Sequence, residues 1–251
     1  MPATESDHRS AAAIATSAGE LLVELRENLE RLQINPRTAR DEGDRRSHEY
    51  IMDALAREHP DDAVLSEEGV DDPERLSSSR VWIVDPLDGT REFGEYGRTD
   101  WAVHVALVID GRVEAAAVAL PALGRTLTMD PPPEPAPASE GPPRLVVSRS
   151  RPPVIAAALA YELDGEMLAL GSAGAKAMAV VLGLADVYAH SGGQYEWDSA
   201  APTGVAAAAG LHVSRLDGSP LEYNRPDPWL PDLLICRPEL ADAILAVTQD
   251  R

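Results

Sequence analysis

One short segment constrains the fold of this chain more than any other, because an apolar strand in it leads directly into two aspartates. Residues 81–84 are apolar and predict a strand, and Asp85 and Asp88 follow at its end with Pro86 between them. Proline has a fixed φ and restricts the residue before it, so the backbone has to turn between the two carboxylates. A glycine and a threonine come next and offer backbone amides to an anion. This combination predicts a site for hard cations and a phosphate, as in a metal-assisted phosphoester hydrolase.

The charge balance limits the partners of such a site. The chain of 251 residues carries 22 Lys and Arg against 42 Asp and Glu, a net charge of −20, and its pI is about 4.6. A protein this acidic has no broad basic surface to neutralise a nucleic-acid backbone, so we expect no nucleic-acid polymer as a partner. A small phosphorylated substrate remains compatible, because bound divalent cations supply positive charge locally.

Cysteine content and hydropathy restrict the location of the chain. The single cysteine, Cys236, lies in an apolar run and is interpreted as a buried residue, and no intrachain disulfide or cysteine zinc site can form. The N-terminal segment lacks the pattern of a secretory signal, and no apolar stretch reaches the ~18 residues that span a bilayer. We therefore expect a cytoplasmic protein without a membrane-embedded segment.

Hydrophobic periodicity predicts an N-terminal α+β lobe over residues 1–130 that carries most of the acidic site. Asp44 is expected to cap the second helix of this lobe, and Asp110-Gly111 to form the turn of a hairpin. The predicted elements are helices over residues 10–34 and 45–58, and strands over residues 63–65, 81–84, 101–109 and 113–120.

A second lobe is predicted over residues 144–251, since helix and strand patterns alternate there as in α/β layers. Residues 131–143 between the lobes are rich in proline and are expected to form an extended connector. The elements predicted in the second lobe are strands over residues 144–148, 186–190 and 233–236, and helices over residues 154–161, 173–184, 199–209 and 238–247.

Acidic residues recur at the ends of the predicted elements: Asp44, Glu67, Asp85, Asp88 and Asp198. Each has an ordinary explanation when taken alone, such as capping the helix that follows it or holding a turn. Together they would cost several kcal/mol to bury without cations. Oxygen ligands without His or Cys pairs favour Mg²⁺ over zinc. A hydrolase of this kind also needs a proton acceptor for water, and a Thr hydroxyl bonded to a carboxylate that is not on the metal can serve.

Three motifs resemble the signature motifs of the inositol monophosphatase superfamily of lithium-sensitive, Mg²⁺-dependent phosphatases. They are Glu67-Glu68, Asp85-Pro-Leu-Asp-Gly-Thr90 and Trp197-Asp-Ser-Ala-Ala201, and they occur in the superfamily's order across nearly the whole chain. The resemblance implies an α+β fold, a layered αβαβα sandwich of the inositol monophosphatase/fructose-1,6-bisphosphatase type. It also implies two or three Mg²⁺ ions, inhibition by Li⁺, and a homodimer as one possible assembly.

The resemblance further implies a role for each matching residue. The metal ligands would be Glu67, Asp85, Asp88 and Asp198, together with the backbone carbonyl of Leu87. Asp44 and Thr90 would activate the attacking water, and the amides of Gly89 and Thr90 would hold the phosphate. Upstream of Asp44, the sequence Arg37-Thr-Ala-Arg-Asp-Glu-Gly departs from the lysine-bearing loop of the superfamily, which bears on the third metal and on loop closure.

Three further segments resemble the CysQ-type branch of the superfamily, the 3′-phosphoadenosine 5′-phosphate (PAP) phosphatases. These segments are Arg91-Glu-Phe93, Val147-Ser-Arg-Ser-Arg151 and Gly171-Ser-Ala-Gly-Ala-Lys176. The resemblance implies substrate contacts from Ser148, Arg149, Ser172 and Lys176. A physical argument agrees, because the second phosphate of a bisphosphate nucleotide needs Arg, Lys or a helix N-terminus to hold it.

The expected function is therefore Mg²⁺-dependent removal of the 3′-phosphate of PAP, giving AMP and phosphate, in sulfate assimilation. This activity is that of a 3′(2′),5′-bisphosphate nucleotidase, a phosphoric monoester hydrolase. The alternatives are a phosphatase for inositol 1-phosphate or fructose 1,6-bisphosphate, and a non-catalytic regulator that binds phosphate and metal. Zinc proteases and serine hydrolases are not expected, because no His-Glu-x-x-His or Gly-x-Ser-x-Gly motif is present. His104 and His190 lie in strand-like runs and are interpreted as structural.

Overall fold

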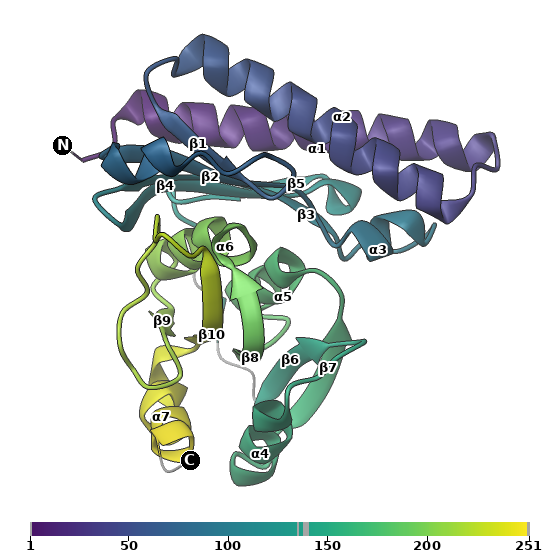
Figure 1. The fold of residues 1–251 in the computed structure, drawn as a ribbon. Helices are drawn as coiled ribbons and strands as arrows, with labels where there is room; N and C mark the ends of the chain where they lie inside the picture. The colour runs from purple at the N-terminus through teal and green to yellow at the C-terminus, as the bar shows by residue number, and fades with distance from the viewer. Residues whose placement is uncertain (1, 135, 138–140, 250–251) are drawn as a thin grey trace.

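The structure, a computed structural model, describes residues 2–134, 136–137 and 141–249. Helices and sheets alternate in layers, in the order helix, sheet, helix, sheet, helix (Figure 1). Each sheet has five strands, and apolar cores fill the spaces between successive layers. The arrangement confirms the predicted α+β fold with an αβαβα sandwich.

The first sheet has the strand order β1-β2-β3-β4-β5, in which β1 and β2 are parallel and the other neighbours are antiparallel. Asp85 pairs with His104 and Asp88 with Ala102, so the register of β2 against β3 shifts between the two aspartates. The shift surrounds Pro86, which has no N–H to donate to a neighbouring strand. The strands are β1 Ala63–Ser66, β2 Arg80–Asp88, β3 Ala102–Ile109, β4 Arg112–Leu120 and β5 Arg125–Thr128.

Two long helices, α1 (Glu5–Arg31) and α2 (Pro36–Glu58), cover the outer face of this sheet (Figure 1). α2 begins well before the predicted residue 45, because Asn35 caps it and Pro36 occupies its first turn. The polar first part of α2 has no apolar stripe, so periodicity did not predict it. Asp44 therefore lies inside the helix, and its predicted role as N-cap was wrong. The short helix α3 (Thr90–Gly94) follows β2.

The middle layer holds α5 (Ala173–Val181) and α6 (Glu196–Ala208), which pack between the sheets through many small side chains (Figure 1). α6 starts directly after a strand, earlier than the predicted residue 199. Asp198 is consequently in its first turn, where the carboxylate accepts a 2.7 Å hydrogen bond from the amide of Tyr195. The predicted helix start at residue 199 was therefore three residues late, and Tyr195, not Asp198, is the N-cap residue.

The second sheet has the order β7-β6-β8-β10-β9, and α4 and α7 cover its outer face. Short strands such as β5, β7 and β9 were not predicted, since their burial alternates weakly or not at all. The remaining elements are β6 Arg144–Ser148, β7 Glu166–Leu170, β8 Val187–Tyr195, β9 His212–Ser214, β10 Trp229–Cys236, α4 Val154–Glu162 and α7 Ala241–Gln249, with 3₁₀ turns η1 Pro73–Ser77, η2 Pro121–Leu123 and η3 Pro238–Leu240.

The described part of residues 131–143 contains no helix or strand, while residues 135 and 138–140 lie outside the described residues. The first sheet ends before this segment and the second begins after it. The division of the chain into lobes over residues 1–130 and 144–251 stays a prediction. Within the described ranges, the helices include none with both the length and the apolar character needed to cross a bilayer.

Candidate active site

Two buried aspartates and a half-buried one converge where the end of β2 meets the first turn of α6. One carboxylate oxygen from each of Asp85, Asp88 and Asp198 lies within 4.8 Å of the other two. Asp85 and Asp88 are only 1% and 6% exposed, so their charges have little access to water. The sequence predicted these three residues as metal ligands, and the fold brings them together from both halves of the chain.

Glu67 follows the neighbouring strand β1 and lies beside this cluster, although it is exposed and is not among the three residues whose oxygens lie within 4.8 Å of one another. β1 runs parallel to β2, and the amide of Glu67 donates to the carbonyl of Val84 (3.3 Å), which sets its side chain beside Asp85. Burial and the neighbouring carboxylates raise the pKa of Glu67 to about 7, and burial and the charge of Glu67 raise the pKa of Asp85 well above its ordinary value.

Asp198 completes the cluster from the opposite side. Burial and the charge of Asp88 raise the pKa of Asp198 to about 6. Acidic groups that hold protons near neutral pH are expected where a cation belongs, because the cation would replace those protons. All the donors are oxygens and no cysteine or histidine is among them, so the set fits a hard cation such as Mg²⁺.

Asp88 differs from its neighbours because the first turn of α5 holds it as a carboxylate. It accepts from the Ser172 hydroxyl (2.5 Å) and from the amides of Ala173 (3.0 Å) and Gly174 (2.6 Å). Burial opposes ionisation, but His104, Lys176 and the Ser172 hydrogen bond together lower the pKa of Asp88 to about 2. Ser172 was predicted as a substrate contact, but its hydroxyl donates a hydrogen bond to Asp88, a predicted metal ligand.

His104 is a member of this site that the sequence did not reveal. Its side chain is fully buried, with Nε2 3.2 Å from Asp88 and Nδ1 2.9 Å from the carbonyl of Trp197. Burial favours the neutral ring, but the charge of Asp88 outweighs it and raises the pKa of His104. The imidazole therefore links the β2 aspartates to the first turn of α6. The register of β3 against β2, which places His104 opposite Asp85, was the signal that could have identified it.

The predicted pair for water activation, Asp44 and Thr90, is also assembled. The Thr90 hydroxyl lies 3.2 Å from Asp44 and 3.1 Å from the carbonyl of Leu87. Burial and the charge of Glu68 raise the pKa of Asp44 to about 7. The turn itself is fixed from α2, because the Ser47 hydroxyl donates to the carbonyl of Pro86 at 2.6 Å. A carboxyl that titrates near neutral pH, bonded to a hydroxyl, can accept a proton from water.

Asp88, Thr90 and Asp198 line one side of a cleft of about 670 Å³, large enough for a nucleotide-sized ligand. Asp44, Asp85 and His104 lie behind this wall and are not part of the lining. Gly89, in the left-handed backbone conformation, and Thr90 belong to its wall beside the acidic cluster. Ser148, Ser172 and Lys176 also line the cleft, whereas Arg149 does not. The other polar or charged residues of the lining include Arg91, Ser150, Arg151, His190 and Tyr195.

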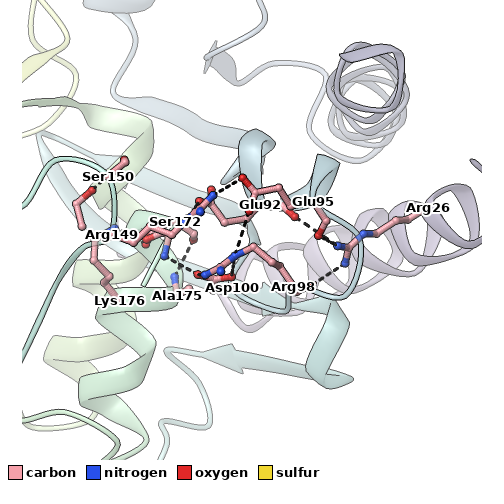
Figure 2. A network of polar contacts seen from close by, with 12 residues as sticks. Arg26, Glu92, Glu95, Arg98, Asp100, Arg149, Ser150, Ser172, Ala175 and Lys176 are labelled. Carbon is pink, nitrogen blue, oxygen red and sulfur yellow. Dashed lines mark hydrogen bonds and ion pairs between the residues drawn. The ribbon is translucent and has the colours of Figure 1, made fainter. Parts of the chain in front are cut away.

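The two cations predicted to contact substrate are both engaged by the protein. The Lys176 ammonium is 6% exposed and donates to the carbonyls of Gly171 and Ser172, and burial lowers the pKa of Lys176. Figure 2 shows Arg149 reaching Glu92 and Glu95, at 2.5 and 2.7 Å. The structure thus places Arg149 in ion pairs with Glu92 of α3 and with Glu95, the residue after α3, beside the cleft but not in its wall.

A sequence profile described as "Inositol monophosphatase family" matches residues 5–130 and 144–250. A Mycobacterium leprae protein named 3′-phosphoadenosine 5′-phosphate phosphatase is 52% identical over 257 residues, covering 98% of this chain and 94% of the relative. The Escherichia coli 3′(2′),5′-bisphosphate nucleotidase CysQ is 30% identical, covering 86% and 94%. The crystal structure of inositol monophosphatase II from Staphylococcus aureus superposes with a TM-score of 0.79 at 22% identity, covering 98% of each chain.

Proposed function

The chain belongs to the inositol monophosphatase family, and on this premise we propose that it is a Mg²⁺-dependent phosphatase that removes the 3′-phosphate of PAP, giving AMP and phosphate. The observation that carries the proposal is the convergence of three aspartates, two of which line a cleft of nucleotide size together with Thr90, whose hydroxyl donates to Asp44. The printed names of the relatives support the substrate, since two of them act on 3′-phosphorylated nucleotides by name.

In this proposal the acidic cluster holds two or three Mg²⁺ ions, and Li⁺ inhibits on the millimolar scale. The ligands would be Glu67, Asp85, Asp88 and Asp198, with the carbonyl of Leu87. Bound Mg²⁺ supplies Lewis acidity toward the phosphoryl oxygens and the attacking water. The raised pKa values of Glu67, Asp85 and Asp198 support this assignment, because these groups carry protons that a cation can displace.

The Thr90 hydroxyl and Asp44 move the proton of the attacking water. The hydroxyl accepts a proton from water while it passes its own to the Asp44 carboxylate, 3.2 Å away. The pKa of Asp44, raised to about 7 by burial and by Glu68, matches that task near neutral pH. The amides of Gly89 and Thr90 orient the phosphate that is removed, since both residues line the cleft next to the acids.

Phosphate release from three substrates tests the proposal: PAP, inositol 1-phosphate and fructose 1,6-bisphosphate, each with Mg²⁺. We expect kcat/KM for PAP to exceed the other two by at least about a hundredfold, which corresponds to ~2.7 kcal/mol of preference in the transition state. Equal kcat/KM values for all three substrates would agree with the proposed metal chemistry but contradict the proposed preference for a nucleotide. Tight binding of PAP in calorimetry without turnover would instead support the non-catalytic regulator.

A further inference from the structure

Four cationic side chains lie in or beside the cleft, and they divide into two kinds. Arg149 and Lys176 are engaged by protein groups, as described above. Arg91 and Arg151 are exposed and line the cleft. Among the described residues, neither of these two guanidinium groups has a hydrogen-bond or ion-pair partner. In a chain with a net charge of −20, two such cations in the wall of one cleft need an explanation.

The partners of Arg149 are themselves fixed from the other side. Arg26 of α1 donates to the carbonyls of Glu95 and Arg98, each at 2.7 Å, and to that of Glu92 at 3.3 Å. Figure 2 shows Glu92 and Glu95 lying between Arg149 and Arg26. Glu92 is only 5% exposed, so the ion pair with Arg149 is partly shielded from water. Arg149 therefore ties the segment after β6 to a well-supported α3.

This tie positions the two unpartnered arginines. Arg91 stands next to Glu92 on α3, directly after the phosphate-binding amide of Thr90. Arg151 is two residues from Arg149, in a turn closed by a hydrogen bond from its amide to the Ser148 hydroxyl (3.2 Å). The charge of Arg151 also reaches His190 on the cleft wall, where, after burial, it is among the influences that lower the pKa of His190.

We propose that Arg91 and Arg151 hold the second phosphate of the bisphosphate substrate, the one that is not removed, and that Arg149 is a positioning residue for them. This inference rests on the proposed function. Arginine suits the task because its planar fork binds phosphate oxygens in pairs, and an exposed guanidinium without a carboxylate partner has no ion pair to break. Arg91 comes from the half of the chain with the first sheet and Arg151 from the half with the second, so the phosphate would bridge the two.

Steady-state kinetics on two substrates tests the assignment. PAP has the second phosphate, and adenosine 3′-phosphate has the same scissile phosphate without it. Arg91→Gln and Arg151→Gln are each expected to raise KM for PAP about tenfold, with kcat within about twofold, and to leave the constants for adenosine 3′-phosphate unchanged. Arg9→Gln is the matched control, because Arg9 is exposed on α1 and, within the part of the chain that the structure describes, its one ion-pair partner is Glu5. This control variant should have the same KM and kcat as the wild-type enzyme for both substrates.

The positioning role of Arg149 is tested by a double-variant cycle. Because Arg149 acts through the placement of Arg151, Arg149→Gln with Arg151→Gln should raise KM for PAP little more than Arg151→Gln alone. A purely structural role would give additive effects on both substrates. If Arg149→Gln alone raises KM for PAP selectively while the Arg91 and Arg151 variants behave as wild type, Arg149 is the contact and the inference is wrong. If the wild-type enzyme does not hydrolyse PAP, the proposed function itself has failed.

Discussion

Asp88 illustrates how a single side chain is prepared for a cation. Its carboxylate accepts three hydrogen bonds from the first turn of α5 and lies beside the buried His104. These contacts lower its pKa to about 2 against the effect of burial, while the pKa values of its acidic neighbours Glu67, Asp85 and Asp198 are raised. The cluster thus combines one fixed anion with groups whose pKa values are raised, as proposed for a metal site.

Asp88→Asn tests this role at the level of one residue. The change keeps the shape of the side chain but removes the charge, so we expect turnover to fall at least a hundredfold, since a metal ion contributes several kcal/mol to the transition state. The thermal unfolding midpoint serves as the control for folding and should show a folded protein. Activity within a few-fold of wild type would contradict the assignment of Asp88 as a ligand.

Gly174→Ala makes a second prediction at this scale. A Cβ at Gly174 would lie 2.1 Å from Nε2 of His104, so the imidazole must move away from Asp88. We expect the affinity for Mg²⁺ to weaken by about tenfold or more, as for other changes in groups that orient metal ligands. Gly69→Ala is the control, because the nearest atom there is 3.4 Å away, an ordinary contact. Calorimetric titration with Mg²⁺ that gives equal affinities for both variants would contradict the role of His104.

At the scale of elements, the sequence predicted what depends on local pattern. Periodicity predicted strand β2, and Pro86 predicted the turn at its end. The Asp110-Gly111 turn predicted the β3–β4 hairpin, and the order of the motifs predicted the segments that carry the acidic residues. The start of α2 and the first turn of α6 were missed, since a polar helical segment has no stripe and α6 follows β8 without a loop. The ion pairs of Arg149 could not be predicted, because Glu92 and Glu95 become its neighbours only when the two sheets assemble.

The start of α2 gives a prediction for this scale. Asn35 accepts a 3.0 Å hydrogen bond from the amide of Thr38, so Asn35→Ala should lower the free energy of unfolding by ~1 kcal/mol in urea denaturation. Asp44→Ala is the comparison. Asp44 is a half-buried carboxyl inside the helix with a raised pKa, so its removal at pH 8 should not destabilise the protein. The reverse pattern would mean that the helix begins near Asp44.

At the scale of the whole molecule, the site exists only when both sheets pack on the middle helices. The first sheet carries Glu67, Asp85 and Asp88, whereas Asp198 and the amides that hold Asp88 come from α6 and α5. Assembly therefore concentrates negative charge in a protein that already carries −20. Without metal, this concentration opposes folding. The cytoplasmic location and the homodimer stay predictions.

The pH dependence of stability follows from this charge. Asp44, Glu67, Asp85 and Asp198 have raised pKa values in the folded protein, so their contribution to stability is greatest below their unfolded pKa values. For Asp44, Glu67 and Asp198 this contribution is lost as the pH rises through about 6 to 7. The pKa of Asp88 is lowered to about 2, so the contribution of Asp88 to stability is lost only as the pH falls toward that value. In EDTA, the unfolding midpoint should therefore be lower at pH 8 than at pH 5.5, and saturating Mg²⁺ should reduce the difference. A midpoint that rises with pH in EDTA would contradict the clustering of protonated acids.

The most direct test of the central claim identifies the product of PAP hydrolysis. The metal-stripped enzyme would be incubated with PAP, with and without Mg²⁺, and the nucleotide product resolved by ³¹P NMR. Placing the 3′-phosphate at the acidic cluster predicts 5′-AMP and phosphate, formed only with Mg²⁺. Formation of adenosine 3′-phosphate, or release that does not depend on Mg²⁺, would contradict it.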